Sequence, residues 1–188
     1  MRVIAGTHRS RQLAAPKGLD TRPTSDRLRE ALFNVLAPRI AGTHFVDLYA
    51  GSGAVGIEAL SRGVAHVWFA EKAVPAVAAI RANLKALRIE SGYTIDERGT
   101  LALLATLAEK GTAVDILFLD PPYDAAHEYQ STLAFLGGAG ASAMFAADTM
   151  VVAEHNKKIP LAEKYGALER TRVLQQSDAA LSFYRRVG

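Results

Sequence analysis

"DLYAGSGAVGIEAL", residues 47–60, is the stretch most informative about the fold, because it joins the end of an apolar strand to the start of a helix through a glycine-rich turn. Gly51, Gly53 and Gly56 follow the spacing G-x-G-x-x-G. Glycines at such a turn let backbone N–H groups approach a ligand closely at the N-terminus of a helix. The stretch therefore predicts a strand, a ligand-binding loop and a helix.

Around this loop, apolar runs of strand length alternate with helical patterns. The expected strands cover residues 44–49, 66–71, 93–98, 114–120 and 149–155, and an expected crossover helix covers residues 73–88. Strands that alternate with helices indicate a parallel sheet covered on both faces. Two more strands flank Gln176 to Asp178 with no room for a crossover helix, so they should be antiparallel. The predicted fold class is α/β, with a doubly wound, mostly parallel Rossmann-like sheet whose last strand is antiparallel.

Residues 1–40 have a different character and are predicted to form a basic extension of a main domain that covers residues 41–188. They contain eight Lys and Arg and three acidic residues, although the whole chain has a formal net charge of only +3. We expect a short β-hairpin around Thr7 to Ser10, followed by a helix with Thr24 or Ser25 as N-cap that Pro38 ends. Such a basic arm is suited to binding a polyanion. The alternative interpretation is that residues 1–40 form a solvated tail.

Length and composition narrow the class of protein. The chain has 188 residues, of which 49% are hydrophobic, enough for one well-buried core. No apolar run approaches the roughly 20 residues of a membrane span, and the N-terminus lacks the apolar centre of a secretory signal, so a soluble cytoplasmic protein is expected. There is no cysteine, and the five histidines have no metal-ligand spacing, so no metal is expected.

The glycine loop by itself leaves two cofactor classes open. Glu71 follows Gly51 by twenty residues and ends the second expected strand, where an acid can accept hydrogen bonds from a ribose. This arrangement also satisfies the dinucleotide fingerprint of nicotinamide enzymes. However, Asp47 places a carboxylate where a pyrophosphate would be repelled and a cationic sulfonium attracted. The loop therefore favours S-adenosylmethionine over NAD.

A second motif, "LFLDPPY", ends the fourth expected strand at residues 117–123. Pro121 and Pro122 stiffen the segment, because each fixes its own φ and restricts the residue before it. The stiff segment presents two acceptors, the Asp120 carboxylate and the Pro121 carbonyl, which suit the two hydrogens of an amino group. Tyr123 adds a ring on which a base can stack. We interpret the motif as a clamp for the exocyclic amine of a base, with a plain strand-ending turn as the alternative.

Together, "DLYAGSGAVGIEAL", "FAEK" and "LFLDPPY" resemble the class I S-adenosylmethionine-dependent methyltransferases that modify exocyclic amines. The N-terminal "RVIAGTHRSRQLAAP" and "RPTSDRLREALFNVL" are similar to the signature of the bacterial 16S rRNA guanine-N2 methyltransferase family known as RsmD, and "VVAEH" and "ALSFYRR" fit its closing segments. The resemblance implies a seven-stranded sheet with an N-terminal extension. It also implies methylation of guanine 966 in 16S rRNA or the small ribosomal subunit, by a monomer that needs no metal.

The resemblance carries site residues over by position. It implies that the cofactor site consists of Asp47, Tyr49, Gly51, Ser52, Gly53, Glu71 and Lys72. Thr100 stands where such enzymes commonly carry an acid for the adenine, and Asp96 or Glu97 replaces it if the register differs. Asp120, Pro121, Pro122 and Tyr123 become the catalytic amine clamp. Arg2, Arg9, Arg11, Arg22 and Arg27 become RNA contacts, although Arg22 and Arg27 are equally suited to bracing the clamp.

Three other functions remain open from the sequence. A DNA adenine-N6 or cytosine-N4 methyltransferase uses a similar clamp, although this chain has no second domain to read a duplex. An NAD-dependent oxidoreductase is supported by the glycine loop alone. A non-catalytic RNA-binding factor would retain the fold without the reaction, and the intact Asp120 and Tyr123 argue against it.

Overall fold

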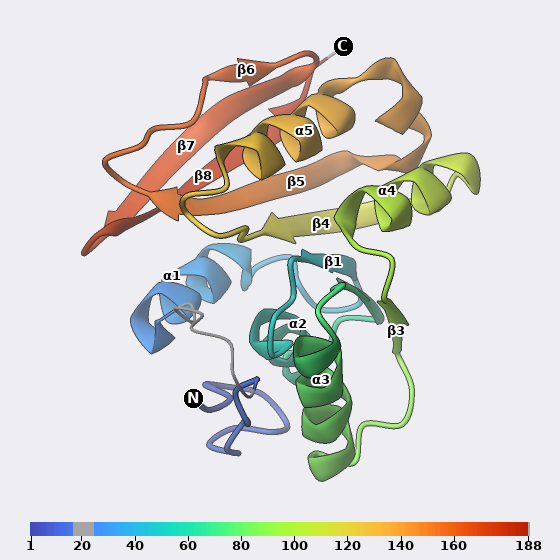
Figure 1. Ribbon diagram of the computed structural model, residues 1–188, viewed down its shortest axis with the longest axis vertical. Coiled ribbons are helices and arrows are strands. Elements are labelled where there is room, and N and C mark those ends of the chain that lie inside the picture. The colour runs from blue at the N-terminus through green and yellow to red at the C-terminus, as the bar shows by residue number, and fades with distance from the viewer. Residues whose placement is uncertain (17–24, 188) are drawn as a thin grey trace. The chain divides into compact units, whose positions relative to one another are not determined.

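The computed structural model describes residues 1–16 and 25–187, so Arg22 and Thr24 lie outside the described residues. The chain divides into two compact units, Met1–Gly99 and Thr100–Gly188. The basic N-terminal residues 1–16 belong to the first unit (Figure 1).

The first unit is built on three parallel strands in the order β3-β2-β1. Its elements are α1 (Asp26–Leu36), β1 (His44–Leu48), α2 (Ala54–Ser61), β2 (His66–Ala70), α3 (Val74–Ala86) and β3 (Tyr93–Asp96). Helices α1 and α2 cover the same face of the sheet, since Phe33 of α1 stacks on Phe45 and Gly56 of α2 packs on Phe69. This face forms part of the core of the unit.

Helix α1 forms as its sequence predicts. Ser25 is the N-cap, and its hydroxyl accepts a hydrogen bond from the Leu28 N–H at 3.2 Å. Asp26 lies in the first turn, where a negative charge favours the helix dipole. The apolar stripe that includes Leu28, Leu32 and Leu36 is fully buried. Ser25 is therefore the cap of the helix.

The second unit contains a parallel pair followed by antiparallel strands, in the order β4-β5-β8-β7-β6. Its elements are α4 (Thr100–Glu109), β4 (Val114–Leu119), α5 (Ala126–Gly137), the 3-10 helix η1 (Ala139–Met144), β5 (Phe145–Asn156), β6 (Lys164–Tyr165), β7 (Leu168–Gln176) and β8 (Ala179–Arg186). Helix α5 packs against β6 and β7 (Figure 1). The parallel α/β class and the antiparallel C-terminal strands are thus confirmed. The seven expected strands are all present, and the two-residue β6 adds an eighth.

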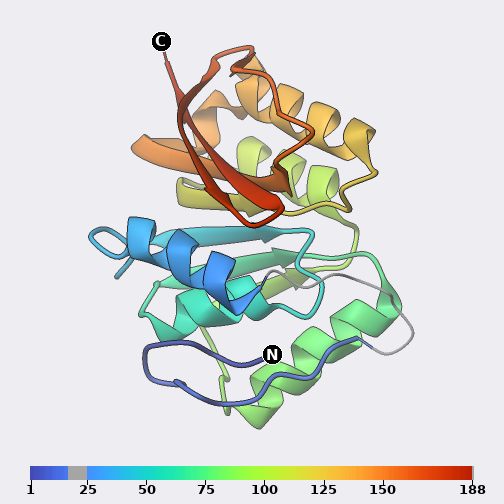
Figure 2. The same ribbon diagram turned by 90° about the vertical axis from the view of Figure 1, so that its left-hand side faces the viewer.

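The N-terminal segment folds back on itself but does not form a regular hairpin. Its two arms share only one isolated bridge, Arg2 to Gln12, together with backbone bonds such as Val3 N–H to the Arg11 carbonyl at 2.9 Å. Regular pairing stops because backbone groups of residues 4–8 bond instead to side chains and a carbonyl of α2. Figure 2 shows this segment running beside α2 and α3.

Within residues 1–16 and 25–187, no helix combines the length and the apolar character needed to cross a membrane. In the same part of the chain, no three His, Asp or Glu side chains are grouped so that they could hold a metal ion.

Candidate functional site

The glycine loop after β1 is held by the neighbouring strand and by Glu71. The Ala50 N–H donates to the Ala70 carbonyl at 3.0 Å, and the Gly51 N–H donates to Glu71 Oε2 at 2.9 Å. Gly51 and Gly53 have φ values of 55° and 76°, in the left-handed region that favours glycine. A Cβ added at Gly51 would meet no atom within 4 Å. The loop therefore needs glycine for its backbone conformation and leaves open space beside Gly51.

Gly56 has a different role from the other two glycines. A Cβ at this position would lie 2.2 Å from a ring atom of Phe69 and 2.9 Å from Val67. The missing side chain therefore lets α2 lie close against β2. Gly56 is a packing glycine rather than a ligand-contacting one, as the third glycine of such fingerprints often is.

Asp47 lies beneath the loop and is only 1% exposed. Its Oδ2 accepts a hydrogen bond of 2.8 Å from the Gly56 N–H. This N–H lies in the first turn of α2, where backbone N–H groups have no acceptor within the helix. Burial raises the pKa of Asp47 to about 8; the Gly56 N–H opposes this rise, and the nearby Glu71 adds to it. In this structure the carboxyl group binds the start of α2 directly, which ties β1 to the glycine loop.

The raised pKa of Asp47 predicts a pH-dependent stability. Between about pH 4 and pH 8 the folded protein retains a proton that the unfolded chain has released, so the free energy of unfolding should fall as the pH rises. Asp47→Asn cannot ionise, and its stability relative to the unsubstituted protein should therefore increase by up to about 1.4 kcal/mol per pH unit. Urea unfolding without cofactor, at pH 5 and pH 7.5, measures this difference.

The exposed Asp124→Asn serves as the control, and its effect should not change between the two pH values. If the difference for Asp47→Asn were also constant, Asp47 would titrate as an ordinary carboxyl and its burial would have no effect on the pKa.

Glu71 lies next to the glycine loop, where the sequence predicted it. Its second oxygen, Oε1, accepts from the Ala73 N–H at 2.9 Å, so the carboxylate links the loop to the start of α3. Among the other predicted cofactor residues of this unit, Tyr49 is half-buried with φ 65°, Ser52 is buried, and Lys72 is exposed. The structure thus gathers the predicted loop residues around one turn.

The three candidates for the adenine contact have different surroundings. Asp96, at the end of β3, pairs with Arg98 through both carboxylate oxygens, and this hydrogen bonding lowers the pKa of Asp96. Glu97 forms an ion pair with Arg81. Thr100 is buried and begins α4 in the second unit. Both acids are therefore already paired with arginines.

The DPPY segment follows β4 in the second unit and is supported by two further side chains. The Tyr123 hydroxyl donates to Glu154 Oε1 at 3.1 Å. The Tyr129 hydroxyl lies 3.1 Å from the Pro121 carbonyl oxygen and 2.9 Å from the Glu154 carbonyl oxygen. Glu154 is 4% exposed, and Tyr129 is 5% exposed. Strand β5 and helix α5 thus hold the segment in place.

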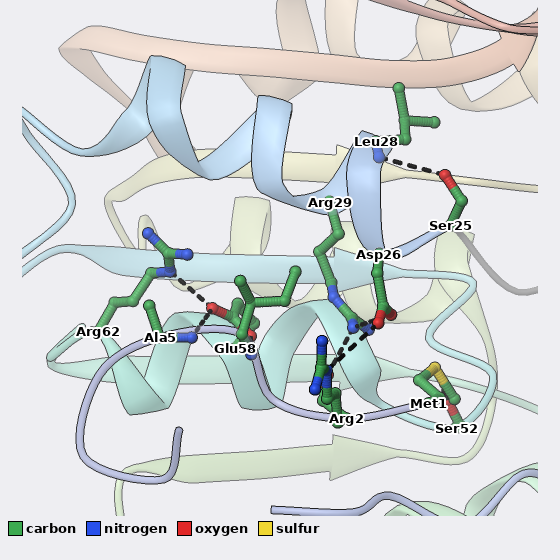
Figure 3. A network of polar contacts seen from close by, with 11 residues as sticks. Met1, Arg2, Ala5, Ser25, Asp26, Leu28, Arg29, Ser52, Glu58 and Arg62 are labelled. Carbon is green, nitrogen blue, oxygen red and sulfur yellow. Dashed lines mark hydrogen bonds and ion pairs between the residues drawn. The ribbon is translucent and has the colours of Figure 1, made fainter. Parts of the chain in front are cut away.

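The basic N-terminal segment is fastened to α2 by one buried carboxylate. Glu58 is fully buried, and its oxygens accept from the Ile4 N–H at 2.7 Å and the Ala5 N–H at 3.0 Å. The Arg62 Nε also donates to Glu58, at 2.8 Å (Figure 3). Ser61 adds a hydrogen bond of 2.9 Å from the His8 N–H to its hydroxyl. The backbone of residues 4–8 is therefore bound to one helix.

A second attachment joins the segment to α1. The buried Arg29 donates through Nη2 to the Arg2 carbonyl at 2.6 Å and to Asp26 at 2.9 Å (Figure 3). The Arg2 side chain lies near the same carboxylate, with Nε 3.7 Å from Asp26 Oδ2. Arg9 and Arg11 are exposed on the turn, and Arg27 is exposed on α1. Val3 and Leu13 of the segment are buried, whereas these basic side chains lie at the surface.

Several residues that shape these sites are not among the predicted ones, although each carries a signal in the sequence. Glu58, Asn83 and Glu154 are polar residues that interrupt apolar patterns: "VGIEAL", "AIRANLKAL" and "VVAEHN". A polar residue on a buried face must find a partner, so such an interruption indicates a buried hydrogen-bond network. The partners themselves are distant in sequence, and only the tertiary structure reveals them.

The fold and the loop define a class, namely Rossmann-like α/β proteins whose glycine turn and strand-end carboxylate suit a nucleoside cofactor. The family model described as "Conserved hypothetical protein 95" matches residues 1–185, and the chain belongs to that family.

Individual relatives agree with this assignment. A Bacillus subtilis (strain 168) protein, provisionally named rRNA methyltransferase YlbH, is 35% identical over 188 residues and matches along 100% of both chains. Ribosomal RNA small subunit methyltransferase D of Escherichia coli (strain K12) is 39% identical over 123 residues, which is 65% of this chain and 60% of the relative. A solved structure from Escherichia coli, described provisionally as methyltransferase yhhF, has a TM-score of 0.80 at 32% identity over 99% of this chain and 97% of that chain. The family resemblance inferred from the sequence motifs is therefore confirmed.

Proposed function

We propose that the protein transfers a methyl group from S-adenosylmethionine to the exocyclic N2 amine of a guanine in 16S rRNA, corresponding to guanine 966 of the family. The observation that supports this most directly is the braced DPPY segment, whose Pro121 carbonyl and Tyr123 hydroxyl are bonded to buried groups. The relatives named as rRNA methyltransferases narrow the substrate to ribosomal RNA. The proposal includes a cytoplasmic monomer acting on rRNA or on the small ribosomal subunit.

The first unit fits the proposed cofactor. The space beside Gly51 is open, and Glu71 is half-exposed at the end of β2, where its carboxylate is suited to ribose hydroxyls. Both Glu71 oxygens already accept one backbone N–H each, and a carboxylate oxygen retains a second lone pair for another donor. Asp47, Tyr49, Ser52, Gly53 and Lys72 belong to the same proposed cofactor site.

When bound, S-adenosylmethionine supplies a methyl group on a positively charged sulfur, which is electrophilic without further activation. The amine is the weak partner, because the base delocalises its lone pair. We assign the Asp120 carboxylate and the Pro121 carbonyl to its two hydrogens, which would free the lone pair for attack. The Pro121 carbonyl has two lone pairs, so the Tyr129 hydroxyl and the amine can share it. Asp120 or water then takes the released proton.

The remaining residues of the segment position the base. Tyr123 offers its ring for stacking, and the hydrogen bond to Glu154 restrains the hydroxyl end of that ring. The target guanine must be unpaired or flipped, because its N2 lies at the minor-groove edge of a base pair. A loop nucleotide meets this requirement at the least cost in free energy.

Identification of the methylated nucleoside tests the proposed function. The protein is incubated with labelled S-adenosylmethionine and, separately, with small ribosomal subunits, free 16S rRNA and duplex DNA from cells that lack the activity. We expect N2-methylguanosine from the ribosomal substrates only. Label in N6-methyladenine or N4-methylcytosine of DNA would instead support the DNA methyltransferase, and no label in any substrate would contradict a methyltransferase role.

A salt titration tests the RNA contact assigned to the N-terminal turn. Arg9→Glu combined with Arg11→Glu should weaken RNA binding at least about ten-fold at low salt, because two exposed cations become anions. If each arginine meets one phosphate, the slope of log K against log salt concentration should also decrease in magnitude by about 1.4. Fluorescence anisotropy with a labelled rRNA fragment measures both.

Lys157→Glu combined with Lys158→Glu is the matched control, because it makes the same change in charge at exposed positions of the second unit. Equal losses of affinity in the two variants would indicate a general charge effect rather than a contact at the N-terminal turn.

A further inference from the structure

One buried amide, that of Asn83 on α3, joins the glycine loop to the basic N-terminal segment. Asn83 is 3% exposed. Its Nδ2 donates to the Ser52 carbonyl at 3.0 Å and to the Ala14 carbonyl at 3.0 Å. Its Oδ1 accepts from the Ala14 N–H at 2.8 Å. A single side chain therefore satisfies backbone groups of two segments that are 38 residues apart in sequence.

The two segments meet at a second point. The Ser52 hydroxyl lies 3.9 Å from the Met1 sulfur, so the same loop residue contacts one end of the N-terminal segment directly and is joined to Ala14 through Asn83 (Figure 3). Between these ends, Glu58 and Ser61 of α2 hold residues 4–8, and α2 itself begins directly after the glycine loop. The loop, the helix and the basic turn thus form one continuous hydrogen-bonded structure.

The bonds of Asn83 make the two segments depend on each other. If the loop moved the Ser52 carbonyl away, one buried Nδ2 hydrogen would lose its acceptor, and if the segment detached, the Oδ1 and the other hydrogen would lose the Ala14 backbone. Leaving buried polar groups without partners is unfavourable. Each ordered segment therefore stabilises the ordered form of the other.

We propose that Asn83 is a positioning residue that couples cofactor binding at the glycine loop to RNA binding by the N-terminal segment. The inference rests on the proposed function, which assigns these two ligands to these two segments. A ligand that holds Ser52 in place favours the attached form of residues 1–14, in which Arg9 and Arg11 have defined positions. Coupling of this kind is reciprocal, so RNA should raise the affinity for the cofactor by the same factor.

Hydrogen exchange in the ligand-free protein tests the link without reference to function. Asn83→Asp keeps an acceptor for the Ala14 N–H but, when ionised, removes both donors. It should speed amide exchange in residues 2–14 and also in residues 51–54. Ser61→Ala, the matched control, removes the hydroxyl that bonds the His8 N–H and the Ala5 carbonyl without touching Ser52, and it should speed exchange in the N-terminal segment only. A change confined to one segment in Asn83→Asp would overturn the inference.

Ala14→Pro breaks the same link from the other side. The substitution deletes the Ala14 N–H, which donates to Asn83 Oδ1. Because Ala14 is exposed, the side chains of the core stay unchanged. We expect faster exchange at residues 51–54 in this variant as well. The result remains interpretable if Asn83→Asp fails to fold, and unchanged loop exchange in Ala14→Pro would contradict the link.

The coupling itself is the ratio of two RNA dissociation constants, measured with a labelled rRNA hairpin in the absence and presence of saturating S-adenosylhomocysteine. The unsubstituted protein should bind RNA at least about five-fold more tightly with the cofactor product present. This ratio should fall to about one in Asn83→Asp and Ala14→Pro. In Ser61→Ala both constants should rise by the same factor, which leaves the ratio unchanged.

The outcomes separate the inference from the proposed function. If the unsubstituted protein bound no S-adenosylhomocysteine in calorimetry, the proposed function would fail, while the exchange comparison would still decide the link. If it bound both ligands and the ratio were the same in Asn83→Asp and Ala14→Pro as in the unsubstituted protein, the proposed function would stand and the coupling role of Asn83 would be wrong.

Discussion

Asp120→Ala is expected to lower the rate of methyl transfer about 100- to 1,000-fold, while the Kd for S-adenosylmethionine stays within about three-fold of the unsubstituted value. The carboxylate belongs to the DPPY segment, and the proposed mechanism uses it to accept a hydrogen from the amine of the base. The residues that we propose bind the cofactor at the glycine loop lie elsewhere in the sequence, so the Asp120 substitution should not change cofactor binding directly. Single-turnover transfer of labelled methyl to small ribosomal subunits, together with calorimetry for the cofactor, measures the two quantities.

Asp124→Ala provides the matched control, because Asp124 lies in the same connection between β4 and α5 and is exposed. It should leave both the rate and the affinity nearly unchanged. A parallel loss of rate and cofactor affinity in Asp120→Ala would contradict the clamp, since the carboxylate would then act through the cofactor or through the fold.

Glu58→Ala is expected to lower the free energy of unfolding by about 3 kcal/mol, because breaking a buried ion pair from one side leaves the partner groups unsatisfied. Glu58 is fully buried, and its removal deprives the Ile4 and Ala5 N–H groups and the Arg62 side chain of their acceptor. Urea unfolding measures the loss. Hydrogen exchange should show that residues 2–8 lose protection first.

Two other variants test whether the lost buried hydrogen bonds cause the destabilisation by Glu58→Ala. Glu58→Gln keeps one acceptor oxygen and should be less destabilising than Glu58→Ala. Glu30→Ala removes a carboxylate that is exposed on α1 and should change stability by less than about 0.5 kcal/mol. A small effect of Glu58→Ala would mean that the N-terminal segment is held mainly by Arg29, Ser61 and Asn83.

The regular elements were largely predictable, because local patterns report them. The apolar runs at residues 44–49 and 66–71 match β1 and β2 within one residue, and the stripe in residues 73–88 matches α3 within two residues at either end. The hairpin at the N-terminus was predicted less well. Its turn residues are favourable for a hairpin, but the backbone donors of residues 4–8 bond to Glu58, Ser61 and the Ser61 carbonyl instead of to each other.

The candidate site was predictable in its residue types and only partly in its contacts. Glu71 lies beside the glycine loop as expected, since a strand end and a neighbouring strand end meet in a parallel sheet. Asp47 was assigned to the cofactor site from the sequence, and the structure adds that its carboxyl group accepts the Gly56 N–H at the start of α2. The sequence shows a carboxylate at a strand end but not which of several nearby donors it meets.

The parallel α/β class, the glycine loop, the DPPY segment and the family could all be inferred from sequence alone, because they depend on spacings within short stretches of chain. The tertiary structure alone decided which buried polar groups are paired. Asn83 with Ser52 and Ala14, Glu58 with the N-terminal backbone, and Glu154 with Tyr123 are each contacts between residues at least 31 positions apart. A polar residue in an apolar pattern indicates that a buried donor or acceptor must be satisfied, but its partner is distant in sequence and is therefore not identified by the local pattern.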